Sequence, residues 1–295
     1  MENLESKFMG YHSIVLVKQV PDTANVTGDA MKEDGTVNRA ALPTIFNPED
    51  LHALEAALEI KDRFGGRVTV VTMGPPKAAD VLRDALYRGA DRAILLTDRR
   101  AAGSDTLATS YILARAVETV GDYDFVFCGR QAIDGDTAQV GPQCAEKLGI
   151  PQVTYLEEIL NLEGKKAVLR RNIGNGYETV EAALPVLVTV VETANNPRPI
   201  AAKRLMKNKH KRVPLELTAD SPEMAAAKEK GDLLEQWGLD EIGAEMERCG
   251  FAGSPTKVFR IQSIVLKKEG FTEVAPTEEG IRGLIHELVV DRTLG

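Results

Sequence analysis

Hydrophobic and polar residues alternate over roughly the first 150 positions in a pattern that predicts strands followed by helices. A β-branched run predicts a strand over 13–20, and a long loop then extends to about Phe46. Asn47 is a cap residue for the next helix, with proline at its first position and a glycine pair as its stop. Further strands are predicted over 67–73, 92–97 and 125–128, and the helices that follow them include 106–120 and 137–148. This alternation predicts an α/β fold, a Rossmann-like open parallel sheet with helices on both faces.

The periodicity changes after about residue 157. Strands predicted over 165–171 and 177–183, separated by a Gly-Asn-Gly turn, indicate an antiparallel flap over 157–183. A short strand near 153–156 and another over 185–191 extend the sheet. We expect a flexible leader over 1–10, an α/β domain over 11–192, a basic loop over 193–213 and a C-terminal arm over 214–295.

The net charge and the composition argue against several classes of function. With 36 Lys plus Arg and 44 Asp plus Glu, the formal charge is −8, which disfavours nonspecific binding to nucleic acid. No apolar run approaches the length of a membrane span, and the polar, acidic start does not resemble a secretory signal, so we expect a cytoplasmic protein. The three widely spaced cysteines, Cys128, Cys144 and Cys249, are expected to be buried free thiols, and no metal site is expected.

In an open parallel sheet, ligands bind beyond the carboxyl ends of the strands. The loop over 129–142 is the richest of these segments, because it combines Gly129, Gly135 and Gly141 with polar side chains and leads into a helix. Backbone N–H groups at such a helix start suit a phosphate or pyrophosphate. The alternative is a glycine-containing turn in which aspartates act as caps. Asp134 and Asp136 are expected to cap the turn, hold ribose hydroxyls or face water.

Other loops at this edge of the sheet have simpler interpretations. Ser104, Asp105 and Thr106 are default cap residues for any helix. Lys18 is either a solvated charge or an electrostatic partner for a ligand phosphate, and Met73 is most simply a packed side chain.

A basic stretch over 198–215 contains seven Lys or Arg residues and no acidic residue. Such a run is usually a solvated loop, but its proline-interrupted setting favours a protein contact surface. The absence of interleaved aromatic residues disfavours nucleic acid.

Several of these segments resemble the β subunits of electron transfer flavoproteins, over nearly the whole chain after about residue 11. The similar segments are 17–23, 47–50, 73–75, 89–91, 129–134 with its continuation, 184–186, 196–198 leading to 205–207, and 253–256.

The resemblance implies a heterodimer with a larger α subunit whose mobile domain holds a flavin. It also implies an adenine nucleotide in the β subunit. That nucleotide is structural AMP in the ordinary branch, whereas in the electron-bifurcating branch it is a second FAD that accepts hydride from NADH and splits the electron pair. The partners implied are an acyl-CoA dehydrogenase or related oxidoreductase and, for bifurcation, a low-potential acceptor such as ferredoxin or flavodoxin.

The cofactor-binding residues expected from this resemblance and from the strand-end loops form one set. They are Leu16, Lys18, Asn47, Pro48, Glu49, Asp50, Met73, Ser104, Asp105, Thr106, Gly129, Arg130, Gln131, Ala132, Ile133, Asp134, Gly135, Asp136, Thr137, Ala138, Gln139 and Val140. The expected partner-binding residues are Asn196, Pro197, Arg198, Ala202, Lys203 and Met206. No residue of this chain is expected to act as an acid–base catalyst, because a flavin carries the chemistry.

Three segments resemble the bifurcating branch, namely 17–23, 102–107 and 134–141. In the last of these, Gly135 stands where the ordinary branch tends to carry a more acidic sequence, and glycine lets the backbone approach a diphosphate. Ala202 departs from the family, whose ordinary members carry a leucine anchor for the dehydrogenase there, so a different partner contact is expected. The alternatives are a β subunit with structural AMP and an ATP-using ligase on a similar fold. The ligase is disfavoured because the segment 18–21 cannot form a Ser-Gly-Gly-rich pyrophosphate loop.

Overall fold

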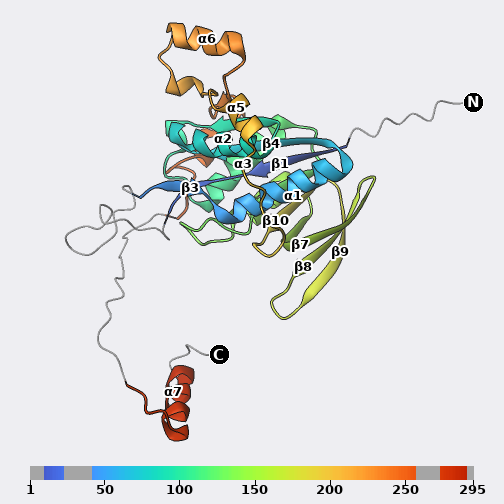
Figure 1. The fold of residues 1–295 in the computed structure, drawn as a ribbon. Coiled ribbons are helices and arrows are strands. Elements are labelled where there is room, and N and C mark those ends of the chain that lie inside the picture. The colour runs from blue at the N-terminus through green and yellow to red at the C-terminus, as the bar shows by residue number, and fades with distance from the viewer. Residues whose placement is uncertain (1–9, 23–41, 257–272, 291–295) are drawn as a thin grey trace, which may run out of the picture.

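The computed structural model describes residues 10–22, 42–256 and 273–290. Its centre is a nine-stranded sheet with the strand order β11-β5-β4-β1-β6-β10-β7-β8-β9 (Figure 1). The strands are β1 (Tyr11–Leu16), β4 (Gly66–Met73), β5 (Arg92–Leu96), β6 (Phe125–Gly129), β7 (Gln152–Glu163), β8 (Lys166–Asn172), β9 (Tyr177–Ala183), β10 (Val186–Val190) and β11 (Glu235–Trp237). The helices are α1 (Pro48–Phe64), α2 (Ala79–Arg88), α3 (Thr106–Val120), α4 (Val140–Leu148), α5 (Ala202–Asn208), α6 (Pro222–Lys230) and α7 (Glu278–Val290). Short 3₁₀ turns are η3 (Pro76–Ala78), η4 (Arg99–Ala101), η5 (Pro214–Glu216) and η6 (Met246–Arg248).

Helices cover both faces of the parallel part of the sheet, as the alternating pattern predicts. Leu54 and Leu58 of α1 and Leu82 of α2 belong to one buried cluster. Ile112 of α3 and Cys144 of α4 belong to a second cluster on the opposite face. β1, β6 and β10 are buried along their whole length, because helices cover both faces of this part of the sheet.

The first predicted strand, 13–20, divides into two. β1 ends at Leu16, and the chain leaves the main sheet to form β2 (Gln19–Pro21), which pairs antiparallel with β3 (Thr44–Phe46). The reason is a tether from α1: Lys18 N donates to Asp50 Oδ2 at 2.8 Å, and Asn47 N donates to Lys18 O at 2.9 Å. The prediction of one continuous strand is therefore wrong, because the break depends on residues about 30 positions away.

The antiparallel flap is present, but it begins inside a longer strand than predicted. β7 pairs parallel with β10 at its start and antiparallel with β8 along the rest of its length. The two ladders meet near Tyr155, which has a φ of 60° and interrupts the register. Figure 1 shows β7, β8 and β9 extending away from the helices at one side of the sheet.

The region expected to be an arm from residue 214 onward belongs partly to the body of the protein and partly to helices outside it. β11 pairs parallel with β5 at the edge of the main sheet, and Leu239, Ile242 and Cys249 are buried in the second core cluster. α6 stands off the body at one end, and α7 stands apart at the other (Figure 1). None of the thirteen residues of α7 is buried. The predicted leader, 1–10, lies outside the described residues except for Gly10.

The described helices offer no candidate membrane span, since none combines the length and the apolar character that crossing a bilayer requires.

Candidate functional site

A cleft with a volume of about 470 Å³ opens at the carboxyl ends of the central strands. Its base includes the last residue of β1, Leu16, the last residue of β4, Met73, and the end of β6 at Cys128 and Gly129. β1 lies between β4 and β6, so the chain order reverses here, which is where open α/β sheets bind ligands. The volume lies within the range of about 300–1,000 Å³ that is usual for small-molecule sites.

The structure brings most of the predicted cofactor-binding residues to this cleft. Those that line it are Leu16, Lys18, Asp50, Met73, Ser104, Asp105, Thr106, Gly129, Arg130, Gln131, Ala132, Gly135, Asp136, Thr137, Ala138, Gln139 and Val140. Five predicted residues do not line it: Asn47, Pro48, Glu49, Ile133 and Asp134. Apart from the exposed Pro48, these five support the residues that do.

Asn47 is the N-cap residue of α1, as expected, but its side chain holds the loop after β6. The side chain makes no cap hydrogen bond with the first turn of α1. Instead, Asn47 Nδ2 donates to Gln131 O at 2.9 Å, and Ile133 N donates to Asn47 Oδ1 at 3.2 Å. The side chain is fully buried between the two chain segments, which explains why its amide satisfies backbone groups of the loop.

Asp50 joins the ends of two strands. Its carboxylate accepts hydrogen bonds from Lys18 N at 2.8 Å and from Gly129 N at 3.0 Å. Burial raises the pKa of Asp50 from 3.8 to about 7, against the effect of these hydrogen bonds. Gly129 is required here because a Cβ at this position would lie 2.6 Å from Asp50 Oδ1.

Glu49 fixes the next two residues of the same loop. Its carboxylate accepts from Arg130 Nη2 at 2.6 Å and from Gln131 N at 3.0 Å. The Arg130 guanidinium also lies 5.9 Å from the ring of Tyr155, at the start of the flap. The first turn of α1 therefore positions residues 129–133 from behind, and the loop presents its other side to the cleft.

The aspartates of the loop are engaged with neighbouring side chains. Lys18 Nζ lies 2.7 Å from Asp134 Oδ1, so the lysine bridges the first strand end to the loop. Asp136 accepts from Gln131 Nε2 at 3.0 Å. Lys18 was expected to be either a solvated charge or a partner for a ligand phosphate. In the structure its exposed ammonium group forms an ion pair with Asp134.

The loop reaches α4 through unusual backbone conformations. Asp136 and Ala138 have φ values of 48° and 53°, in the left-handed region that disfavours residues other than glycine. Backbone strain of this kind is concentrated at ligand sites. The predicted helix start at 137 is wrong, since α4 begins at Val140. The strained turn over 136–138 occupies the three positions before Gln139.

The N-terminus of α4 faces the cleft without a side-chain cap. Gln139 is its N-cap residue and makes no side-chain cap hydrogen bond. Val140 and Gly141 both line the cleft, and their N–H groups fall in the first turn, where an α-helix has no internal acceptor. Gly141 packs tightly, because a Cβ there would lie 2.8 Å from Cys128 Sγ. Free N–H groups at a helix N-terminus are donors of the kind that suit an anion.

The opposite wall is the turn before α3. Asp105 Oδ1 accepts from Leu107 N and Ala108 N, both at 3.0 Å, so the capping interpretation of this residue is confirmed. Thr106 Oγ1 donates to Gln139 Oε1 at 2.8 Å. This hydrogen bond spans the cleft between the N-terminal ends of α3 and α4.

Seven residues line the cleft that were not in the expected cofactor-binding set, namely Val17, Ala101, Gly103, Thr109, Leu113, Cys128 and Gly141. Val17, Gly103 and Gly141 lie in segments that the sequence singled out, whereas the other four do not. Thr109 and Leu113 lie three and seven positions after Thr106, so the helical repeat of α3 was the available signal for both.

The three cysteines are buried and free, as expected. Burial raises the pKa of the Cys144 thiol to about 12 and that of Cys128, beneath the cleft, well above its ordinary value. Over the described ranges, no group of histidine, cysteine and carboxylate side chains is arranged to hold a metal ion.

The expected partner-binding loop is partly helical and partly tied to α1. Arg198 pairs with the buried Glu55 at 2.9 Å and with Asp62 at 2.8 Å, so its guanidinium anchors the loop to α1. Pro197 is half-buried and Asn196 exposed. Ala202 begins α5 rather than lying in a loop, and Lys203 and Met206 of the same helix are exposed.

The sequence matches a known family and several characterised relatives. The electron transfer flavoprotein domain family matches residues 34–218. The electron transfer flavoprotein subunit beta of Clostridium acetobutylicum is 42% identical over 275 residues, covering 93% of this chain and 96% of that protein. Protein FixA of Azorhizobium caulinodans is 43% identical over 279 residues, covering 90% and 91%. The caffeyl-CoA reductase-Etf complex subunit CarD of Acetobacterium woodii is 42% identical over 275 residues, covering 92% and 94%. This chain therefore belongs to the electron transfer flavoprotein family, as one of its β subunits.

Proposed function

We propose that the cleft binds FAD and that the chain is the β subunit of an electron-bifurcating electron transfer flavoprotein. The observation that carries this proposal is the open space at Gly135. A Cβ on Gly135 would meet no other atom within 4 Å, and its φ lies outside the left-handed region. The glycine is therefore not needed for folding the loop, and its lack of a side chain leaves room at the cleft for a diphosphate.

The residues of the cleft fit such a ligand. The uncapped start of α4 directs N–H groups and a positive partial charge toward an anion. Lys18 and Arg130 add two cations, which pair with Asp134 and Glu49 respectively. Leu16, Met73 and Leu113 supply apolar surface deeper in the cleft. This division suits a ligand with a charged linker and an apolar ring.

A bound flavin would supply the redox chemistry, taking electrons from NADH. The protein's task is to hold the ligand and to keep the cleft in one shape. Asn47, Glu49 and Asp50 do this from one side by fixing the loop, and the Thr106–Gln139 hydrogen bond joins the two walls. The electron acceptors proposed for the complex are a partner dehydrogenase and a low-potential acceptor such as ferredoxin or flavodoxin.

The α subunit is proposed to cover α7. Ile281, Leu284 and Ile285 form an apolar stripe on this helix, with exposed fractions of 52%, 39% and 50%. Spacings of three and four residues place these side chains on one face. An exposed face of this kind is typical of a helix that docks on a partner.

The partner dehydrogenase is proposed to dock at α5. Met206 is exposed on this helix, and a hollow of about 350 Å³ beside it is lined by Lys61, Arg204, Lys207 and Lys211 together with Asp91. This excess of cations favours an acidic surface on the partner. The small Ala202 leaves Met206 as the larger apolar side chain for such a contact.

The proposal is tested by titrating the purified heterodimer with NADH in the absence of oxygen. We expect direct bleaching of flavin absorbance in the wild-type complex and its loss in Gly135→Glu. Gly176→Glu is the matched control, because a Cβ on this flap glycine also meets no atom within 4 Å. A wild-type complex whose flavin is not reduced by NADH contradicts the bifurcating assignment.

A further inference from the structure

Asp50 is a buried carboxyl group at the base of the cleft, and its hydrogen-bond donors are uncharged. Its exposed fraction is 6%, and it lines the cleft. Its two carboxyl oxygens accept from the backbone groups Lys18 N, at 2.8 Å, and Gly129 N, at 3.0 Å. Among the described residues, no lysine, arginine or histidine side chain forms an ion pair with it. A carboxylate buried without a cation is costly, so this group favours a bound proton.

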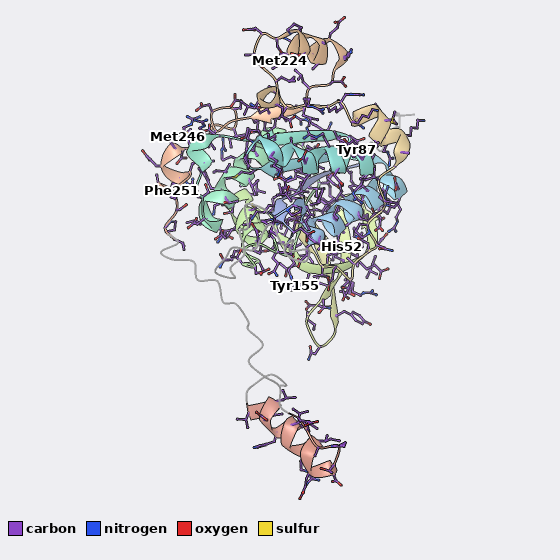
Figure 2. All side chains as sticks on the ribbon, turned by 60° about the vertical axis from the view of Figure 1, so that its left-hand side comes forward. His52, Tyr87, Tyr155, Met224, Met246 and Phe251 are labelled. Carbon is purple, nitrogen blue, oxygen red and sulfur yellow. The ribbon has the colours of Figure 1, made fainter. Side chains whose placement is uncertain are left out.

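The charged side chains around this carboxyl group either carry the same charge or are paired elsewhere. Glu49, the preceding residue of α1, is a second carboxylate and disfavours another negative charge beside it. Lys18 directs its ammonium group to Asp134, 2.7 Å away. Arg130 binds Glu49 at 2.6 Å, and its guanidinium lies 5.9 Å from the ring of Tyr155, which Figure 2 labels beside the flap. Both of these cations are therefore committed to other carboxylates.

The start of α4, where the diphosphate is proposed to bind, is close to Asp50. Asp50 accepts from Gly129 N, and the residue before that glycine is Cys128. Cys128 touches the first turn of α4, since a Cβ on Gly141 would lie 2.8 Å from its sulfur atom. Burial raises the pKa of this thiol well above its ordinary value, so Cys128 adds no charge of its own. An anion bound at this helix end therefore acts on the carboxyl group across a short and largely buried path, where repulsion is strong.

The protonation state of Asp50 decides what it offers to a ligand. For the chain alone, burial raises the pKa of Asp50 to about 7, so both forms are present near neutral pH. The ionised form only accepts hydrogen bonds and repels a diphosphate, whereas the neutral form carries one O–H donor. Because the side chain lines the cleft, this donor can reach a ligand oxygen. An anionic ligand therefore shifts the equilibrium toward the neutral form.

We infer that the cleft binds its nucleotide together with one proton from solvent, which Asp50 holds as a neutral carboxyl group that donates a hydrogen bond to a nucleotide oxygen. This inference rests on the proposed function, since it requires a diphosphate-bearing nucleotide in the cleft. Asp50 is then a positioning residue whose donor exists only when the proton is bound. By linkage, the affinity for the nucleotide falls as the pH rises above neutral.

The proton is counted by calorimetric titration of the purified heterodimer, after removal of its β-site nucleotide. FAD is the probe because none of its groups titrates near neutral pH, whereas the phosphate monoester of AMP has a pKa of about 6. Titrations at about pH 8 in two buffers with different ionisation enthalpies give the number of protons from the difference in heat, and we expect most of one proton to be taken up per FAD bound. This measurement needs no variant, so it does not depend on how well a substituted chain folds.

Asp50→Asn tests whether Asp50 is the group that binds the proton. The dissociation constant of wild type for FAD should rise almost tenfold for each pH unit above about 8. The dissociation constant of Asp50→Asn should not change over this range, because an amide keeps an N–H donor and does not titrate. Asp124→Asn is the matched control and should keep the wild-type slope. Asp124 is also buried, but it pairs with Lys165 and lies at the opposite end of β6 from Gly129.

FAD binding without proton uptake in wild type, or an unchanged slope in Asp50→Asn, would overturn the inference and leave the proposed cofactor in place. Loss of the slope in Asp124→Asn would overturn it as well, because the proton would then not belong to the cleft. A heterodimer whose cleft binds no FAD would overturn the proposed function, and this inference with it.

Discussion

Asp50 Oδ1 accepts a hydrogen bond of 3.0 Å from the backbone N–H of Gly129, which joins the first turn of α1 to the carboxyl end of β6. The other carboxylate oxygen accepts from Lys18 N, just beyond the end of β1. One buried carboxyl group therefore keeps the ends of two adjacent strands together at the base of the cleft.

The raised pKa of Asp50 predicts a pH dependence of stability. Because the folded-state pKa is about 7 against an ordinary value of 3.8, the folded protein binds this proton more tightly than the unfolded chain. The contribution to stability is therefore fully present below about pH 4, is lost as the pH rises to about 7, and is constant above that. Asp50→Asn should flatten this part of the profile, as measured by urea unfolding of the heterodimer between about pH 4.5 and 8.

Asp220→Asn is the control for this experiment, since Asp220 is exposed and its φ of 58° suits asparagine. It should retain the wild-type slope. Superimposable slopes for Asp50→Asn and wild type would show that the Asp50 proton is not linked to folding.

Gly135→Glu should expel a diphosphate-bearing ligand while the chain remains folded. The added carboxylate enters open space beside the cleft, so it repels the ligand without displacing protein atoms. We expect loss of the β-site nucleotide after gel filtration and a thermal midpoint within a few degrees of that of Gly176→Glu. Nucleotide content that equals that of the control variant would refute the location of the site.

Asn47→Ala should destabilise the loop that forms the cleft. The substitution leaves Gln131 O and Ile133 N without their side-chain partner, and an unsatisfied buried polar group costs about 1–3 kcal/mol. Both the free energy of unfolding and the affinity for nucleotide should fall. Asn175→Ala, in the exposed flap turn, should change neither, and a similar small effect in both variants would argue against the role given to Asn47.

Substitutions of Arg198 and Met206 should have different effects. The first should lower stability, and the second should lower the affinity for the partner. Arg198→Ala leaves the buried Glu55 carboxylate without its ion pair, so the free energy of unfolding should fall by about 3 kcal/mol. Met206→Ala removes an exposed side chain, so stability should hold while the affinity for the partner dehydrogenase falls about tenfold. Chemical unfolding and steady-state reduction of the dehydrogenase measure the two effects. If Arg198→Ala instead lowered the affinity for the dehydrogenase and Met206→Ala did not, the docking surface would lie at Arg198.

The alternation of strands and helices was predictable because hydrophobic periodicity is a local property. The break after Leu16 was not, because it depends on Asp50 and Asn47, which come into contact with Lys18 only after folding. β11 was missed for a related reason. Three residues carry little strand signal by themselves, and the edge of β5 is what pairs them.

The candidate site was predictable in its location and less so in its residue roles. Strand-end loops and glycines indicated the cleft, whereas the roles of Asn47 and Glu49 as supports behind it required the contacts to be seen. The family resemblance included the segment 253–256. No pattern in the sequence, however, connects Ser254 to Asp105, which lies about 150 residues earlier and donates its backbone N–H to the serine hydroxyl.

The central claim is that this subunit holds a working flavin. It is tested most directly by releasing the ligands from the purified heterodimer by denaturation and counting FAD and AMP per complex. About two FAD and no AMP is the result we predict, whereas about one FAD and one AMP would contradict the claim and make this chain a structural nucleotide-binding subunit.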